Sequence, residues 1–170
     1  LATLALGRVG ADGGIASVSG ADRYIAAYLR SELEWASDPD DMRFLTRTSL
    51  LDTVAAPPAE RVTGLPCAAD RLTRLAHGNL LIQVVGDTDG SYRYHKLLRD
   101  FLRAELERLE PGGTQVVHRL ASSWYEEAGD AGRAFDHAIG AGDVDRAATI
   151  ASESAETLYR QGQLATIERW

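Results

Sequence analysis

His95 lies where two sequence patterns meet, and its position suits contact with an anion. Before it, Tyr92 and Tyr94 alternate as in a β-strand; after it, apolar residues recur at the spacing of an α-helix. An imidazole at this point lies beside the unpaired N–H groups of a helix start and can donate a hydrogen bond to a phosphate. The alternative is a histidine that bonds only to nearby backbone.

Lys96, Arg99 and Arg103 follow at spacings of three and four residues, so their cationic groups share one face of the expected helix. Such a stripe can meet phosphate groups. It is more typical of a solvated face on which each base pairs with an acid one turn away, as Arg103 and Glu107 are spaced to do. Lys96 and Arg99 are therefore weaker candidates than His95 for a phosphate contact.

The sequence lacks the short motifs of common catalytic and nucleotide-binding sites. It has no G-x-x-x-x-G-K-[ST] phosphate loop, no G-x-G-x-x-G, no G-x-S-x-G, no H-E-x-x-H and no C-x-x-C. Its 4 histidines are spread one to an element without metal-ligand spacing. We expect the chain by itself to be no enzyme, and to hold no metal or cofactor.

The composition of the chain argues against some classes of binding partner. The formal net charge of −7 argues against a surface that grips nucleic acid, because that requires a basic face. Cys67 is a single cysteine, so no internal disulfide can form, and no apolar run reaches the roughly 20 residues of a spanning helix. We expect a cytoplasmic protein with no membrane partner, cut from a longer polypeptide.

The elements expected to position His95 form a winged helix over residues 21–110. Residues 1–20 have the pattern of an upstream helix end and a flexible linker. Helices are expected at 21–36, at 39–50, from Pro57 to Thr63, and from Pro66 to a stop at Gly78.

A β-hairpin and a long helix complete the expected winged helix. The first strand has apolar residues on both faces, so both faces should be covered, and Gly86 to Gly90 can make the turn. Tyr92 and Tyr94 should share a face of the second strand. The helix at about 93–108 offers a broad apolar face, made of Leu97, Leu98, Phe101, Leu102, Leu106 and Leu109.

After Pro111, residues 114–170 have a different pattern, typical of an α-solenoid of the tetratricopeptide type. Thr114 is the expected cap of a helix. The phrase that begins Ala128-Gly129-Asp130 recurs as Ala141-Gly142-Asp143, and each Gly can end one helix while each Asp caps the next. Gly162-Gln163 is a third candidate corner. The predicted fold is thus mainly α: a winged helix followed by helical repeats.

The chain resembles the MalT-like regulators, large ATP-dependent members of the LuxR group of bacterial transcription activators. The phrases that carry the resemblance follow one another in register across about 21–158: Phe44 to Asp52, Gly78 to Leu81, Tyr92 to Leu106, and Ala121 to Gly129 with Ala134 to Asp143.

The resemblance implies a switch ATPase of the STAND class, with a nucleotide-binding domain, a winged helix, a superhelical sensor and an effector. In related switches a Met-His-Asp motif places its histidine on the β-phosphate of ADP, and His95 in Tyr94-His95-Lys96 matches that position. Lys96 replaces the Asp, which removes a carboxylate from the motif. ATP or ADP would then be bound by the full-length protein, with His95 as the contact and Lys96 and Arg99 as weaker candidates.

The resulting hypothesis is a regulatory fragment: a winged helix that gates a nucleotide-binding domain in cis, joined to repeats that receive an inducer or a protein. DNA would be bound only through a C-terminal domain outside this chain. Two alternatives remain. A DNA-binding winged helix would place the 93–108 helix on duplex DNA with steep salt dependence. An interaction scaffold would serve a kinase or cyclase that carries the same ATPase and repeat segments.

Overall fold

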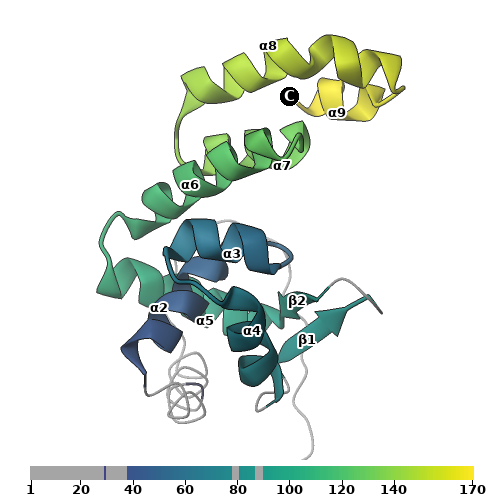
Figure 1. Cartoon of the computed structure of the whole chain (residues 1–170). Helices are drawn as coiled ribbons and strands as arrows, with labels where there is room; N and C mark the ends of the chain where they lie inside the picture. The colour runs from purple at the N-terminus through teal and green to yellow at the C-terminus, as the bar shows by residue number, and fades with distance from the viewer. Residues whose placement is uncertain (1–28, 30–37, 78–80, 87–89) are drawn as a thin grey trace, which may run out of the picture.

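The computed structural model describes Leu29 and residues 38–77, 81–86 and 90–170 of the chain. Its described elements are, in order, α2 (Pro39–Thr48), α3 (Ala56–Thr63), α4 (Ala68–His77), β1 (Ile82–Val85), β2 (Ser91–Tyr94), α5 (Lys96–Leu109), α6 (Gly113–Glu127), α7 (Ala131–Gly140), α8 (Val144–Arg160) and α9 (Leu164–Arg169). The expected mainly helical fold with one β-hairpin is confirmed (Figure 1). The helix expected at 21–36, apart from Leu29, and the stop at Gly78 lie outside the described residues.

Short-range signals set the ends of the first helices. The Asp38 carboxylate accepts a hydrogen bond from the Asp40 amide at 2.9 Å, and Pro39 occupies the first turn of α2. Pro57 and Pro58 lie in the first turn of α3, which ends at Gly64 with φ of 70°. The fourth helix begins at Ala68, two residues later than expected from Pro66.

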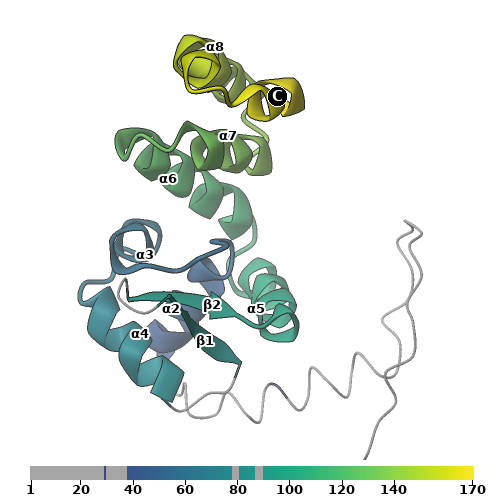
Figure 2. The ribbon, with the colours of Figure 1, turned by 90° about the vertical axis from the view of Figure 1, so that its right-hand side faces the viewer.

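The hairpin is antiparallel, pairs Ile82 with Tyr94, and lies between α4 and α5 (Figure 2). Tyr92 and Tyr94, which were predicted to share one face of the second strand, are both buried. Their hydroxyls bond to helices on either side: Tyr94 to Thr48 of α2 at 2.8 Å, and Tyr92 to Thr73 of α4 at 3.1 Å. A two-stranded sheet is marginal alone, so these contacts with the helices hold it in place.

The prediction that the first strand is covered on both faces is wrong. Ile82 is buried, but Val84 is 64% exposed and Gln83 is exposed. The far end of the hairpin extends beyond the flanking helices (Figure 1), so only the end near His95 is packed.

Helix α5 begins at Lys96, because residues 91–94 pair as a strand, so the expected start near 93 is too early. Its buried stripe is also narrower than predicted. Leu98, Leu102 and Leu106 are buried, whereas Leu97 and Leu109 are 48% and 47% exposed. The buried positions recur every four residues, so the helix packs with one narrow face.

The core continues from the winged helix into α6. It joins Phe44, Leu98 and Leu102 to Val117 and Ala121. At the turn between α5 and α6, the Arg47 guanidinium donates to the Glu110 carboxylate at 2.6 Å and to the Val62 carbonyl at 3.1 Å. These contacts fix the beginning of α6 against α2 and α3.

The cap expected at Thr114 is wrong. Helix α6 begins at Gly113, after Gly112 with φ of 77°. The Thr114 hydroxyl donates to Glu107 at 3.0 Å, so it bridges α5 to α6.

The repeated helix corners are confirmed. Asp130 and Asp143 each accept a hydrogen bond from the amide three residues on, at 3.0 Å in both cases. Gly129, Gly142 and Gly162 all have positive φ, between 71° and 78°. The third corner differs, since Gln163 makes no side-chain cap. Helices α6 to α9 therefore stack away from the winged helix (Figure 1).

Replacing Asp143 by Ala is expected to lower the free energy of unfolding by about 1 kcal/mol, because the Arg146 amide at the start of α8 loses its acceptor. Urea unfolding followed by circular dichroism measures the change. Asp145→Ala, at an exposed position that caps no helix, is the matched control. Equal losses in the two variants would contradict a capping role for Asp143.

Candidate functional site

His95 is the N-cap residue of α5 and is exposed. Its Nδ1 accepts from the Leu97 amide at 3.3 Å, and its own amide donates to the Leu81 carbonyl at 2.7 Å. The second bond holds the end of the hairpin to the start of the helix. Because Nδ1 is an acceptor, the neutral ring carries its proton on Nε2, which has no hydrogen-bond partner among the described residues. His95 thus offers an outward donor at a helix N-terminus.

The neighbouring cations are partly neutralised within the chain. Lys96 is exposed and pairs with Asp100 one turn along, and Arg99 pairs with Asp52 at 3.4 Å. The Arg99 Nε is buried with no hydrogen-bond acceptor among the described residues. His95, Lys96 and Arg99 lie at the same end of α5, so the three candidates are close together, but the two cations already have acidic partners.

Arg103 does not belong to a solvated stripe. Its Nε donates to the Ser49 carbonyl at 3.2 Å, and burial lowers its pKa. Glu107 bonds to the Gly112 amide and to Thr114, so the expected pair of Arg103 with Glu107 is not the contact that forms. Arg103 joins α5 to the end of α2.

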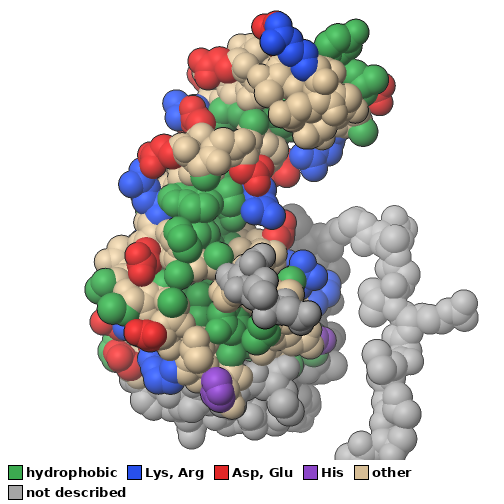
Figure 3. Space-filling view, turned by 45° about the vertical axis from the view of Figure 1, so that its right-hand side comes forward, with side chains coloured by type: hydrophobic (Ala, Val, Ile, Leu, Met, Phe, Trp, Pro, Cys, Tyr) green, Lys and Arg blue, Asp and Glu red, His purple; other side chains and the backbone are tan. Residues whose placement is uncertain are grey.

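On one face of the molecule the stacked helices carry both signs of charge. Figure 3 shows Lys and Arg side chains interspersed with Asp and Glu over the helices above the winged helix. Several of these charges pair between elements, as Arg61 does with Glu127 at 2.7 Å and Arg169 with Asp136 at 3.2 Å. The face in view has no continuous basic area of the kind that binds a nucleic-acid backbone.

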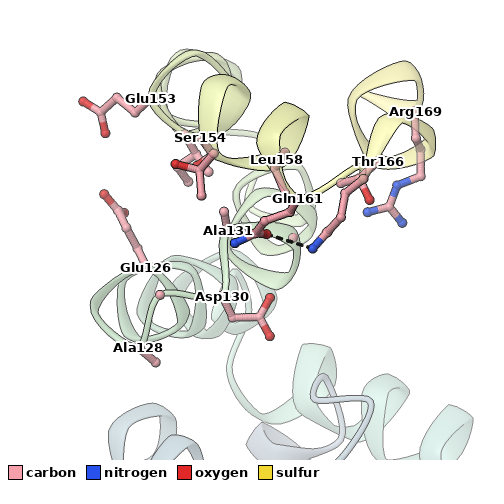
Figure 4. A pocket seen from close by; sticks show the side chains of 15 residues that line it. Glu126, Ala128, Asp130, Ala131, Glu153, Ser154, Leu158, Gln161, Thr166 and Arg169 are labelled. Atoms are coloured by element: carbon pink, nitrogen blue, oxygen red, sulfur yellow. Dashed lines mark hydrogen bonds between the residues drawn. The ribbon is translucent and has the colours of Figure 1, made fainter.

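A polar groove of about 610 Å³ lies between the α6–α7 corner and the α8–α9 hairpin (Figure 4). Glu126, Asp130 and Glu153 bring carboxylates to its lining. Glu126 also pairs with Arg146, and Asp130 with Arg133. On the other side, Gln163 donates to Gln161 at 3.0 Å. This groove can bind polar ligand groups by hydrogen bonds from several helices.

Known protein families were compared with the chain. The family model of the MalT winged helix domain matches residues 30–114, which is half of the chain. The chain belongs to this family. The resemblance to MalT-like regulators is thereby confirmed, and the hairpin, His95 and α5 lie inside the matched MalT winged helix.

Curated relatives extend the similarity beyond the MalT winged helix. The serine/threonine-protein kinase PknK of two Mycobacterium tuberculosis strains and that of Mycobacterium bovis are each 30% identical to this chain over 150 residues. The matched part is 88% of this chain and 14% of each relative. The chain therefore spans a small part of the length of these relatives.

Sequence reasoning missed a pair of histidines between α6 and α7, one buried and one half-buried. His118 of α6 and His137 of α7 approach with their Nδ1 atoms 2.8 Å apart. Tyr125 stacks on His137 with ring centroids 5.4 Å apart and an angle of 11° between the planes. Burial lowers the pKa of His137 to about 4, and it also lowers the pKa of His118. The residues are 19 apart in the chain, so only the helical corner brings them together.

Sequence reasoning also missed the role of Asp41. Its carboxylate is 2% exposed and lies between Arg71 and Arg74 of α4, with Arg74 donating at 2.7 and 2.8 Å. The hydrogen bond from Arg74 lowers the pKa of Asp41. This contact joins α2 to α4, and we infer that its role is to stabilise the fold.

The described residues form neither a metal site nor a membrane-spanning helix. Within 29, 38–77, 81–86 and 90–170, no group of three or more His, Cys, Asp or Glu side chains could hold a metal ion. In the same part of the chain, no helix is both long and apolar enough to span a bilayer.

Proposed function

We propose that this chain is a regulatory section of a larger ATP-dependent switch protein. The MalT winged helix gates a neighbouring nucleotide-binding domain, and the helices from α6 onward receive a ligand or protein signal. The observation that carries the proposal is the exposed His95 at the start of α5, inside a domain of the MalT family. Its Nε2–H, which has no acceptor within the described part of the chain, can donate to an ADP phosphate presented by another domain.

The physical requirement is a contact that differs between two states. A histidine that bonds the diphosphate only when the winged helix is docked stabilises the docked state by the free energy of that bond. A hydrogen bond involving a charged group is worth about 1.5–3 kcal/mol, which corresponds to about 10- to 100-fold in affinity. Lys96 and Arg99 add local positive potential, reduced by Asp100 and Asp52.

In the full-length protein, His95→Ala is expected to weaken ADP retention by about tenfold or more and to raise basal output. Release of a fluorescent ADP analogue and activity without inducer measure the two effects. His77→Ala is the matched control, since His77 is also exposed and ends the neighbouring helix α4. Unchanged ADP release and unchanged basal output in His95→Ala would reject the phosphate contact.

The same proposal places nucleotide binding outside these 170 residues. The melting temperature of the isolated chain should accordingly not rise with ATP. A clear rise at millimolar ATP would mean that the nucleotide site lies within the chain.

The effector has two candidates. The resemblance to MalT-like regulators favours the first candidate, a transcription activator whose DNA contact is made by a separate C-terminal domain. The similarity to PknK favours the second candidate, a serine/threonine kinase regulated by the same winged helix and repeats. The alternative in which α5 itself binds DNA has less support, because Lys96 and Arg99 pair with acids and Arg103 bonds to Ser49. Steep salt dependence of duplex binding would support that alternative.

A further inference from the structure

We propose that the His118–His137 pair is an acid-sensitive latch, which in its neutral form holds α7 on α6 and which opens when both rings are protonated. The proposal concerns how the stacked helices stay attached to the winged helix, and it does not depend on the nucleotide contact of His95.

The distance between the rings limits the protons that the pair can hold. With the two Nδ1 atoms 2.8 Å apart, one must donate and the other accept. One added proton can go to Nε2 of the ring whose Nδ1 donates and leave this bond intact, because Nε2 of the accepting ring already carries a proton. A second added proton puts N–H groups on both Nδ1 atoms, which then point at each other. Full protonation therefore breaks the contact.

The surroundings of the histidine pair disfavour even the first added proton. His137 is 8% exposed, so charging its ring costs desolvation free energy. Arg103 of α5 and Arg133 of α7 act on His137 and lower its pKa, while Asp52, after α2, is the carboxylate that opposes them. Arg103 also lowers the pKa of His118.

The other helices packed on α6 and α7 contribute paired charges. Arg61 of α3 bonds to Glu127, and Arg146 of α8 bonds to Glu126. Tyr125 of α6 faces His137 with a ring whose own pKa is raised by burial. The described surroundings thus favour a neutral pair.

Tight packing prevents the rings from simply turning away. A Cβ placed on Gly140 would lie 2.6 Å from the His118 ring, so that ring rests directly against the backbone of α7. A second polar contact, from the Ser122 hydroxyl to the Ala134 carbonyl at 2.8 Å, joins the same two helices. Relief of two like charges here requires α7 to move away from α6.

The direction of the pH effect follows from the lowered pKa values. A histidine whose pKa is about 4 when folded and 6.5 when unfolded contributes its full stability above pH 6.5. That contribution is lost as the pH falls from 6.5 towards 4. For His137 alone, the unfolding equilibrium constant should rise about thirtyfold between pH 8 and pH 5.

The test is an NMR titration of both imidazoles in the 170-residue chain, with hydrogen exchange of the helix amides at pH 7.5 and pH 5. We expect both rings to titrate below the ordinary pKa of 6.5, with His137 near 4. After correction for intrinsic exchange rates, we expect the amides of α7 and α8 to open at least tenfold more at pH 5, relative to those of α2 and α4. Ordinary titration near pH 6.5 for both rings would overturn the proposal.

The matched variants are His118→Asn with His137→Phe, and His77→Gln. The double variant keeps a polar group at position 118 and an aromatic ring for Tyr125 to stack on, but neither new side chain can take up a proton. We expect it to lose the preferential opening of α7 and α8 at pH 5, whereas His77→Gln should retain it. Unchanged acid sensitivity in a folded double variant would also overturn the proposal; if that variant does not fold, the titration of the unmodified chain decides.

Discussion

Asp41→Asn is expected to lower the free energy of unfolding by about 3–5 kcal/mol, since it leaves a largely buried guanidinium without its carboxylate. The Asp41 side chain is 2% exposed, and that of Arg71 is 18% exposed. The second partner, Arg74, is 56% exposed and can be solvated. Most of the loss should therefore come from Arg71.

Urea unfolding at pH 7.5 measures this loss. Asp136→Asn is the matched control, because Asp136 also pairs with an arginine across helices but its side chain is 51% exposed. The control should change stability by no more than about 0.5 kcal/mol. A loss below about 1 kcal/mol for Asp41→Asn would show that the two arginines do not depend on this carboxylate.

The Asp41 contact and the histidine pair lose their contributions to stability over different ranges of pH. The pKa of Asp41 is lowered, first by the Arg74 hydrogen bond, from an ordinary value of 3.8. Its contribution is therefore present above pH 3.8 and is lost as the pH falls through the lowered pKa. Weakening of the fold between pH 6.5 and 5 has to come from other groups, among which the histidine pair is the candidate.

Local features of the fold could be predicted from the sequence because neighbouring residues determine them. The Asp38 cap, the Asp130 and Asp143 corners and the glycines with positive φ each depend on a few consecutive residues. The family resemblance added the order of the domains. Together these were enough for the architecture and for the position of His95 at a helix start.

The features that could not be predicted are those that depend on tertiary contacts. In the sequence, Asp41 is one of two acidic residues in the first turn of a predicted helix. Only the packing of α4 makes it buried while Asp40 is exposed. Leu97 and Leu109 match an apolar helical face, yet among the described residues each is about half exposed, at 48% and 47%. His118 and His137 belong to different helices, so their spacing carries no metal or catalytic pattern.

These contacts change how the two halves of the chain should be understood. The Pro111-Gly112 break looks like a boundary in the sequence, but α6 beyond it packs on α3 and α5 and shares their core. The outer helices are therefore connected to the winged helix through packed side chains, by which a signal of the kind proposed above would have to pass. The winged helix and α6 should unfold together.

Phe44→Ala tests this cooperativity and should cost about 3–5 kcal/mol, because Phe44 is fully buried and its removal leaves a cavity. The ring also lies 5.8 Å from the Arg71 guanidinium, so its loss weakens the support of the α2–α4 contact. We expect Trp124 fluorescence, measured with Trp35 and Trp170 replaced by Phe so that it reports on α6, and far-ultraviolet circular dichroism to shift to the same lower urea midpoint. Val144→Ala, at a position that is 67% exposed, should shift neither by more than about 0.5 kcal/mol. If Trp124 kept its original midpoint in Phe44→Ala, then α6 would be an independent unit, and a signal in the outer helices could not reach the winged helix through their common core.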